Sequence, residues 1–241
     1  MNMKQKKITG ATLGLAVLAL IGRAYGYDEI VVKDGATIRG SVKLEGAAPK
    51  LAPLQITKYK EICKDVPNET LILGPNRGVR YAVITLEGIG KGKAVEKEVV
   101  HELDNVKCRF TPHVQAASVG QFVQLKNSDP ILHTAHARFT GNQPEFNVGL
   151  YPGRVSRKPL IAPGLVRIQC EVHPWMSAYI VVTDHPYYAV TDKDGSFKIS
   201  NVPAGNYTVE AFHLKAGSKT EKVTVGASDS KTVSFELMAP Q

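Results

Sequence analysis

Residues 166–182 read VRIQCEVHPWMSAYIVV, and this stretch predicts two strands joined by a short turn. In its first part, Val166, Ile168 and Cys170 alternate with polar residues, which is the period of a β-strand and places the Cys170 sulfur on the apolar face. In its last part, residues 178–182 form a nearly continuous apolar run. The chain is therefore expected to turn back on itself directly after a cysteine that faces the protein interior.

The turn itself carries three side chains of types that bind metal ions. Cys170, His173 and Met176 are spaced as Cys-x-x-His-x-x-Met, and Pro174 stiffens the turn between them. These are three of the four ligands of a blue-copper site, in which two histidines and one cysteine form a trigonal set with a weak axial methionine. The methionine disfavours zinc, which would normally take another Cys, His or carboxylate. The second histidine must come from elsewhere in the chain.

A second stretch supplies that histidine and carries a resemblance to a known family. Residues 127–136, NSDPILHTAH, follow an expected strand at 120–126. Asn127 at the end of a strand, with His133 six positions later, resembles the cupredoxins, most closely those of the amicyanin type. That family's short ligand loop, Cys-x-x-His-Pro-aromatic-Met, is matched residue by residue by Cys170, His173, Pro174, Trp175 and Met176.

The resemblance covers roughly residues 104–183, including the F-x-P pattern at Phe110 and Pro112. It departs from the family at SVGQ, where the family's V-x-x-G pattern is expected. It implies a Greek-key β-sandwich that holds one mononuclear copper ion, Cu(I) or Cu(II). The ligands that it implies are His133, Cys170, His173 and Met176.

The resemblance also implies roles for the residues around the ligands. Asn127 is expected to brace the cysteine-bearing turn through hydrogen bonds, and Trp175 to pack at the surface of the site beside Pro174. In the family, electrons pass through the exposed ring of the C-terminal histidine, here His173. Four other histidines are not expected to be ligands: His113, His136, His185 and His213.

The C-terminal part of the chain carries a second resemblance. Residues 189–237 resemble the carboxypeptidase regulatory-like, or prealbumin-like, β-sandwich, with a Thr-Asp-x-x-Gly-x-Phe turn at 191–197 and Pro-Ala-Gly-x-Tyr at 203–207. The first two strands of that family are missing directly before residue 189, but candidates lie upstream at 40–42 and 82–86. We therefore favour one discontinuous sandwich into which the copper domain is inserted. The alternative is two domains in tandem.

The whole chain is thus predicted to be all-β, with four regions. These are a signal peptide at 1–26, an N-terminal β region at 27–100 that completes the C-terminal sandwich, a cupredoxin domain at 101–184, and the smaller sandwich at 185–241. Residues 1–26 begin with lysines, continue with the apolar run 8–21 and end in small residues, as secretory signals do. The apolar run is shorter than the roughly 20 residues of a membrane span, so we expect cleavage and export to the periplasm or the outside rather than a retained anchor.

The chain has three cysteines, an odd number for an exported protein. Cys108 shares strand parity with Phe110 and should point inward. Cys63 ends the one short helix that the sequence suggests, in which Ile56, Tyr59 and Ile62 are at helical spacing. In an oxidising compartment we predict a Cys63–Cys108 disulfide, which leaves Cys170 free for metal. The alternative is two separate buried thiols.

The net charge and the motifs exclude some classes of function and favour others. Without residues 1–26 the chain has 26 basic and 22 acidic residues, a net charge of +4, and it has no basic stripe with interleaved aromatic residues, so nucleic-acid binding is not expected. The resemblance implies an exported carrier of single electrons, not an enzyme, with redox partners such as c-type cytochromes or a dehydrogenase. The alternative is a structural or adhesive envelope module. A Cys170–His173 nucleophile and base ranks last, because the cysteine points inward and no orienting carboxylate is suggested.

Overall fold

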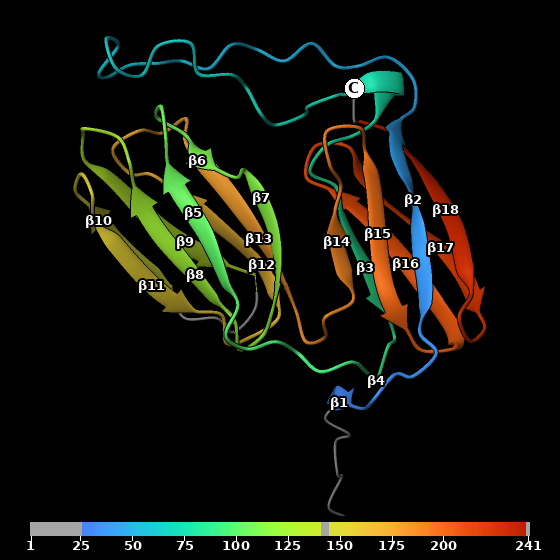
Figure 1. Cartoon of the computed structure of the whole chain (residues 1–241). Helices are drawn as coiled ribbons and strands as arrows, with labels where there is room; N and C mark the ends of the chain where they lie inside the picture. Colours follow the sequence, from blue (N-terminus) through green and yellow to red (C-terminus); the bar gives the residue numbers. More distant parts are fainter. Residues whose placement is uncertain (1–25, 141–144, 240–241) are drawn as a thin grey trace, which may run out of the picture.

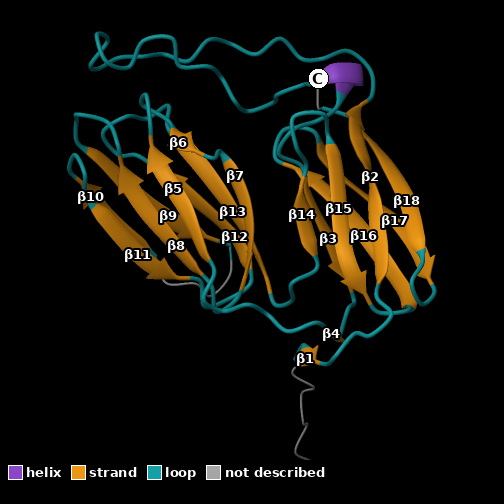
Figure 2. Cartoon of the chain, viewed as in Figure 1, coloured by secondary structure: helices purple, strands orange, loops and turns teal. Residues whose placement is uncertain are grey.

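The computed structural model describes residues 26–140 and 145–239. The predicted signal peptide lies outside the described residues, except for Gly26. The described chain is all-β, as predicted, and its strands form two separate sandwiches that stand side by side (Figure 1). Among the described residues the one helical segment is a single 3-10 turn, η1 (Pro75–Arg77) (Figure 2). None of the described helical structure is long and apolar enough to cross a membrane.

The inserted sandwich, as we call the body formed by β5 to β13, contains His133, Cys170, His173 and Met176, the four predicted ligands. One sheet has the order β10-β9-β12-β13-β7 and the other β11-β8-β5-β6. Its strands are β5 (Val100–Asn105), β6 (Phe110–Thr111), β7 (Val114–Ser118), β8 (Phe122–Asn127), β9 (His133–Phe139), β10 (Phe146–Leu150), β11 (Val155–Pro159), β12 (Gly164–Gln169) and β13 (Ser177–Thr183). Apolar residues alternate along these strands, so that Leu125, Ile168 and Ile180 meet in one core between the sheets.

The flanking sandwich combines strands from both ends of the sequence. Its sheets have the orders β14-β3-β16-β17 and β15-β2-β18. Its strands are β2 (Ala36–Leu44), β3 (Val83–Glu87), β14 (Tyr188–Val190), β15 (Ser196–Val202), β16 (Gly205–His213), β17 (Gly217–Val225) and β18 (Ser230–Leu237). Two short strands, β1 (Asp28–Glu29) and β4 (Lys91–Gly92), pair beside it.

In the flanking sandwich, strands that precede the inserted sandwich in sequence pair with strands that follow it. Val42 on β2 lies opposite Phe235 on β18 in a parallel pair, and Ile84 on β3 lies opposite Ala211 on β16 in an antiparallel pair. These partners are separated in sequence by the whole inserted sandwich. The upstream stretches at 40–42 and 82–86 thus supply the strands that the C-terminal sequence lacks.

A long segment connects β2 with η1 and crosses from one sandwich to the other. Residues 45–74, which we call the strap, leave the end of β2, run over one end of the inserted sandwich and return to η1 (Figure 1). The side-chain amide of Asn68 donates to the Ala52 carbonyl at 2.8 Å and so ties the two limbs of the strap together. Cys63 in the strap is buried and forms the predicted disulfide with Cys108, with Cα atoms 5.2 Å apart.

The short helix predicted at Cys63 is wrong, because residues 60–65 form turns and a bend. Tyr59 and Asp65 have φ angles of 51° and 58°, in the left-handed region that a right-handed helix excludes. Ile56 packs against the core of the inserted sandwich together with Val66. The conformation of this segment is therefore set by its packing on the inserted sandwich and by the disulfide. These tertiary contacts outweigh the local helical pattern.

Candidate metal centre

The centre lies where β9 begins and where the turn between β12 and β13 folds back. His133 is the first residue of β9, and Cys170 follows the last residue of β12. The turn closes through two backbone bonds: the Met176 amide donates to the His173 carbonyl at 2.9 Å, and the Cys170 amide donates to the Met176 carbonyl at 3.3 Å. Strands β9 and β12 are paired, so the sheet itself brings the two ends together.

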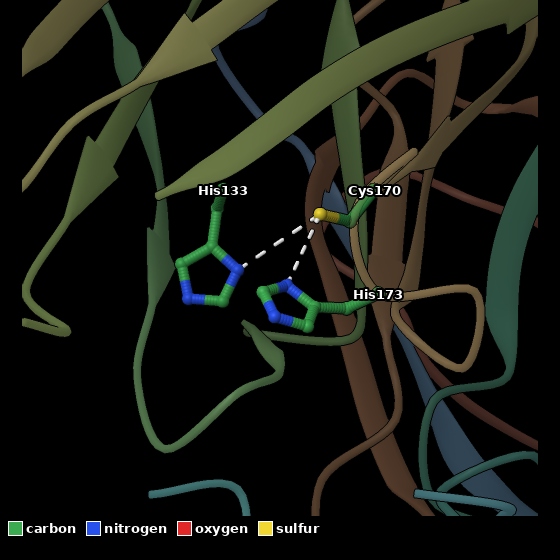
Figure 3. A group of neighbouring side chains, drawn as sticks. All are labelled: His133, Cys170 and His173. Atoms are coloured by element: carbon green, nitrogen blue, oxygen red, sulfur yellow. Dashed lines mark hydrogen bonds between the residues drawn. The ribbon is translucent and has the colours of Figure 1, made fainter. Parts of the chain in front are cut away.

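Three ligand-type atoms meet at this point. The Cys170 sulfur lies 3.5 Å from Nδ1 of His173 and 3.9 Å from Nδ1 of His133, and the two imidazole rings are 4.6 Å apart. Figure 3 shows that both rings turn a nitrogen toward the sulfur. All three ligand-type atoms lie within 4.8 Å of one another, and all three residues are buried. This is a compact N, N, S donor set that is closed to solvent.

Met176, the predicted fourth ligand, belongs to the same turn. Its side chain is 1% exposed and packs in the core that contains Cys170. The turn therefore places the thioether in the buried apolar surroundings of the sulfur.

Thr134, next to His133, braces the cysteine. Its amide donates to the Cys170 sulfur at 3.3 Å, and its hydroxyl accepts the amide of Glu171 at 2.7 Å. The resemblance predicts that Asn127 has this bracing role, and the structure differs. The side-chain amide of Asn127 instead donates to the carbonyls of Ile131 and Leu150 at 2.8 and 2.7 Å, so Asn127 braces the loop that leads to His133.

Asp129 is a site residue that the sequence reasoning missed. Its Oδ2 lies 3.0 Å from Nε2 of His133 and accepts the Cys108 amide at 2.8 Å, while its Oδ1 accepts the Lys107 amide at 2.6 Å. A carboxylate at the far nitrogen of a histidine fixes the tautomer and aims the other nitrogen at a metal. Asp129 therefore directs Nδ1 of His133 toward the sulfur. An aspartate four residues before the histidine was the only sequence signal.

The same contacts set the charges of the cluster. Burial raises the pKa of the Cys170 thiol, but bonds from His133, His173 and the Thr134 amide outweigh it and lower that pKa to about 5. Burial lowers the pKa of His133, whereas Asp129 and Cys170 raise it above its ordinary value. Burial likewise raises the pKa of Asp129, and its bonds to His133 and to two amides lower it overall. The cluster thus favours a thiolate at neutral pH.

His173 is buried, contrary to the exposed ring that the resemblance implied. Its exposed fraction is 0%, and its Nε2 has no hydrogen-bond partner among the described residues. Two rings cover it: Trp175 at a centroid distance of 5.1 Å and Tyr59 of the strap at 5.5 Å. Trp175 is half-buried and donates its indole N–H to the Cys108 carbonyl at 3.1 Å, while Pro174 is exposed.

The four histidines that were not expected to be ligands belong to neither group of possible donors found among the described residues. His136 is two strand positions beyond Thr134, and its Nδ1 contacts the Glu171 carboxylate at 2.5 Å on the outer side of the sheet. His113, His185 and His213 are buried. A second group of possible donors, Cys108, Asp129 and His133, shares His133 with the centre, and its cysteine is held in the disulfide.

Comparisons with known proteins find a family model and several solved structures that match parts of the chain. The model of the carboxypeptidase regulatory-like domain matches residues 170–238, a range that includes β13 of the inserted sandwich. A comparison with curated protein sequences finds no match.

Three solved structures illustrate the matches to the chain. A Cu-containing nitrite reductase from Thermus scotoductus SA-01 is 26% identical with a TM-score of 0.34, over 39% of this chain and 24% of its own. A purple cupredoxin from Nitrosopumilus maritimus is 19% identical with a TM-score of 0.30, over 34% of this chain and 99% of its own. A reduced amicyanin variant is 20% identical with a TM-score of 0.31, over 35% of this chain and 82% of its own. The match thus spans about a quarter of the nitrite reductase.

Proposed function

We propose that this chain binds one copper ion through His133, Cys170, His173 and Met176 and carries single electrons between redox partners. The observation that carries the proposal is the buried convergence of two Nδ1 atoms on one sulfur, within 4.8 Å. One thiolate, two imidazoles and a nearby thioether form the donor set that copper takes in blue-copper sites. Copper would supply the one-electron chemistry, since it changes between the +1 and +2 states.

The chain's own residues prepare this site in three ways. The lowered pKa of Cys170 presents a thiolate, which is the form that binds metal. Asp129 and Thr134 orient the His133 ring and the sulfur. The donors sit at strand ends and on a hydrogen-bonded turn, so they are held on rigid elements that change little between two oxidation states.

A thiolate with a lowered pKa between two imidazoles is also the chemistry of a cysteine nucleophile, and this is the second candidate. Burial opposes it, because Cys170 is 2% exposed and a nucleophile must reach its substrate. The function proposed is therefore electron transfer, without a catalysed reaction of its own.

We also propose that the protein works outside the cytoplasm, in the periplasm or beyond, after removal of residues 1–26. The Cys63–Cys108 disulfide supports this location, because such bonds persist in oxidising compartments. Its partners would be redox proteins, such as c-type cytochromes or a dehydrogenase.

The test is to load residues 27–241 with Cu(II) and record visible and EPR spectra. Wild type should bind one equivalent and show an intense thiolate-to-copper band. Cys170→Ser should abolish the band, and His133→Ala should weaken binding and alter the EPR signal. His136→Ala is the matched control, because His136 lies on the same strand but contacts Glu171 instead. A band that survives Cys170→Ser would refute the ligand assignment. Alkylation of Cys170 by small electrophiles at neutral pH, without copper binding, would favour the nucleophile.

A further inference from the structure

The strap separates the centre from solvent. His173 has no exposed surface, and the ring of Tyr59 packs edge-on against it at 5.5 Å with an interplanar angle of 62°. Tyr59 itself is 46% exposed. Tyr59 thus contacts a donor residue of the centre and is also partly exposed to solvent, so it connects the buried cluster with the surface.

Hydrogen bonds from its neighbours hold Tyr59 in a strained backbone conformation. Its φ angle of 51° is unusual for a bulky residue. Its carbonyl accepts the amides of Ile62 and Cys63 at 2.9 and 2.7 Å, and Cys63 is linked covalently to Cys108. Strained conformations that the surroundings impose on a residue are concentrated at functional sites.

Cys108 in turn contacts the cluster from the other side. Its amide donates to Asp129, which holds His133, and its carbonyl accepts the indole N–H of Trp175, which packs on His173. The disulfide therefore fixes Tyr59 relative to both histidines.

The exposed surface around Tyr59 is basic. Within residues 58–65 of the strap and at position 107 beside the disulfide there are four exposed lysines and two exposed acids, which gives a local net charge of +2: Lys58, Lys60, Lys64 and Lys107, with Glu61 and Asp65. A third acid, Glu69, is paired with Arg109 at 3.4 Å. Ile62, 37% exposed, adds apolar surface next to Tyr59. An aromatic and aliphatic centre with a basic rim suits a partner whose contacting face is acidic.

We propose that the strap is the docking surface of the centre for an acidic one-electron partner, and that Tyr59 is the side chain through which partner and centre are in contact. This inference rests on the proposed copper function. One electron passes between the two proteins in each encounter: one is oxidised as the other is reduced, and no bond forms or breaks. Tyr59 keeps the partner close to His173 while solvent stays excluded from the donors.

The first experiment tests the surface without copper. Hexacyanochromate(III), a paramagnetic trianion that is inert to substitution, is titrated into the isotopically labelled copper-free protein, and line broadening of backbone amides is mapped by NMR. Broadening should centre on residues 58–64 and on Lys107, and should be lost in Lys58→Gln/Lys60→Gln. Broadening centred elsewhere, for example on the exposed lysines of β17, would overturn the docking surface whatever the copper site does.

The second experiment measures electron transfer by stopped flow. Hexacyanoferrate(III), an anion, oxidises the reduced copper-loaded protein, and iron(III) becomes iron(II). At low ionic strength, Lys58→Glu/Lys60→Glu should slow this reaction by about tenfold and accelerate oxidation by the tris(phenanthroline)cobalt(III) cation. Lys219→Glu/Lys222→Glu is the control with the same charge change on β17, and should leave both rates unchanged.

Tyr59 is tested in the same assay by a matched pair of variants. Tyr59→Phe keeps the ring and should keep the wild-type rates, whereas Tyr59→Leu fills the space without a ring and should slow both oxidants several-fold with an unchanged visible spectrum. Equal rates for the two variants would show that the Tyr59 ring is not the contact between the partner and the centre. Failure to bind copper would instead refute the proposed function, and the NMR map would still decide the surface.

Discussion

The two sandwiches of this chain have the same architecture and bury very different interiors. The flanking sandwich has a large apolar core, and His185, Thr191 and His213 are the buried polar residues beside it among those described. The inserted sandwich buries a whole set of polar side chains at one end, among them Asn127, Asp129, His133 and His173. Buried polar groups cost free energy unless they are hydrogen-bonded. The difference teaches that a β-sandwich can form without such a cluster, and that the proposed function depends on the strand ends and loops of one sandwich.

The largest effect is expected from the apolar core of the flanking sandwich. Phe235 is fully buried and packs against Phe197 with centroids 6.1 Å apart. Phe235→Ala should lower the free energy of unfolding by about 3–5 kcal/mol, because it leaves a cavity. Urea unfolding measures this loss, with Leu214→Ala, at an exposed position, as the control. The visible spectrum of the copper-loaded variant should stay that of wild type; a changed spectrum would mean that the two interiors are coupled.

The next effect concerns the covalent link between strap and inserted sandwich. Cys63→Ala together with Cys108→Ala removes a bond that closes a sequence separation of 45 residues. The expected loss of stability is about 2–4 kcal/mol, since the unfolded chain regains conformational freedom. Hydrogen exchange of the strap amides should accelerate, whereas in Phe235→Ala it should not. Strap amides that exchange as slowly as in wild type would show that packing alone holds Tyr59 over His173.

A smaller effect, on stability at low pH, is expected from His213 in the flanking sandwich. Burial, followed by the nearby charge of His113, lowers the pKa of His213 from 6.5 to about 4. Between these values the unfolded chain binds a proton that the folded chain does not, so the free energy of unfolding should fall as the pH falls through this range. His213 Nδ1 accepts the amides of Lys215 and Ala216 at 3.2 and 3.1 Å.

His213→Asn keeps a neutral acceptor for those amides and cannot titrate. Its unfolding free energy, measured in urea at a series of pH values, should therefore fall less steeply than that of wild type between about pH 7 and about pH 4. A residual slope would come from other groups with lowered pKa values, among them His113 and His185, whose pKa values burial lowers. Equal slopes for variant and wild type would contradict the assignment of the acid sensitivity to His213.

Some features of the two sandwiches could be predicted from the sequence, and others could not. Strand parity around Cys170 and the turn spacing to Met176 are local, so the inward-facing cysteine and the donor types of the turn could be predicted from the residues. The meeting of the turn with His133 is a long-range contact, and it was expected only from the resemblance to the cupredoxins. The missing first strands at residue 189 pointed to the upstream partners that the structure pairs. Asp129 escaped prediction because an aspartate in a loop has no periodicity, and its partner depends on the three-dimensional course of the chain.

The strap could not be predicted for a related reason. Ile56 and Val66 pack on a sandwich that follows the strap in sequence by tens of residues, Tyr59 packs on His173, and Ile62 is exposed. The helical spacing of Ile56, Tyr59 and Ile62 therefore does not mark one buried face of a helix. The burial of His173 depends on the same long-range contact with Tyr59. Local pattern thus predicts elements and donor types, while the covering of the site is decided by tertiary structure.

The smallest effect is expected from two threonines, one in each sandwich, whose hydroxyls each accept a hydrogen bond from a backbone amide. The Thr134 hydroxyl accepts the Glu171 amide at 2.7 Å and lies 3.8 Å from the Cys170 sulfur, whereas the Thr191 hydroxyl accepts the Ala82 amide at 2.8 Å. Thr134→Val should cost about 1 kcal/mol of stability, the net value of one hydrogen bond. It should also shift the thiolate-to-copper band, because the sulfur keeps the amide of residue 134 but loses the nearby hydroxyl.

Thr191→Val should cost more stability, since Thr191 is 2% exposed and also donates to the Val79 carbonyl, yet it should leave the band in place. Thr134→Ser keeps the hydroxyl and is the matched control for the band. Visible spectra of the copper-loaded variants, with urea unfolding of each, measure both quantities. If Thr134→Val and Thr134→Ser had the same spectrum, the hydroxyl would have no part in tuning the sulfur. Thr134 would then be a structural residue like Thr191, and the distinction between the two interiors would rest on the donors and Asp129 alone.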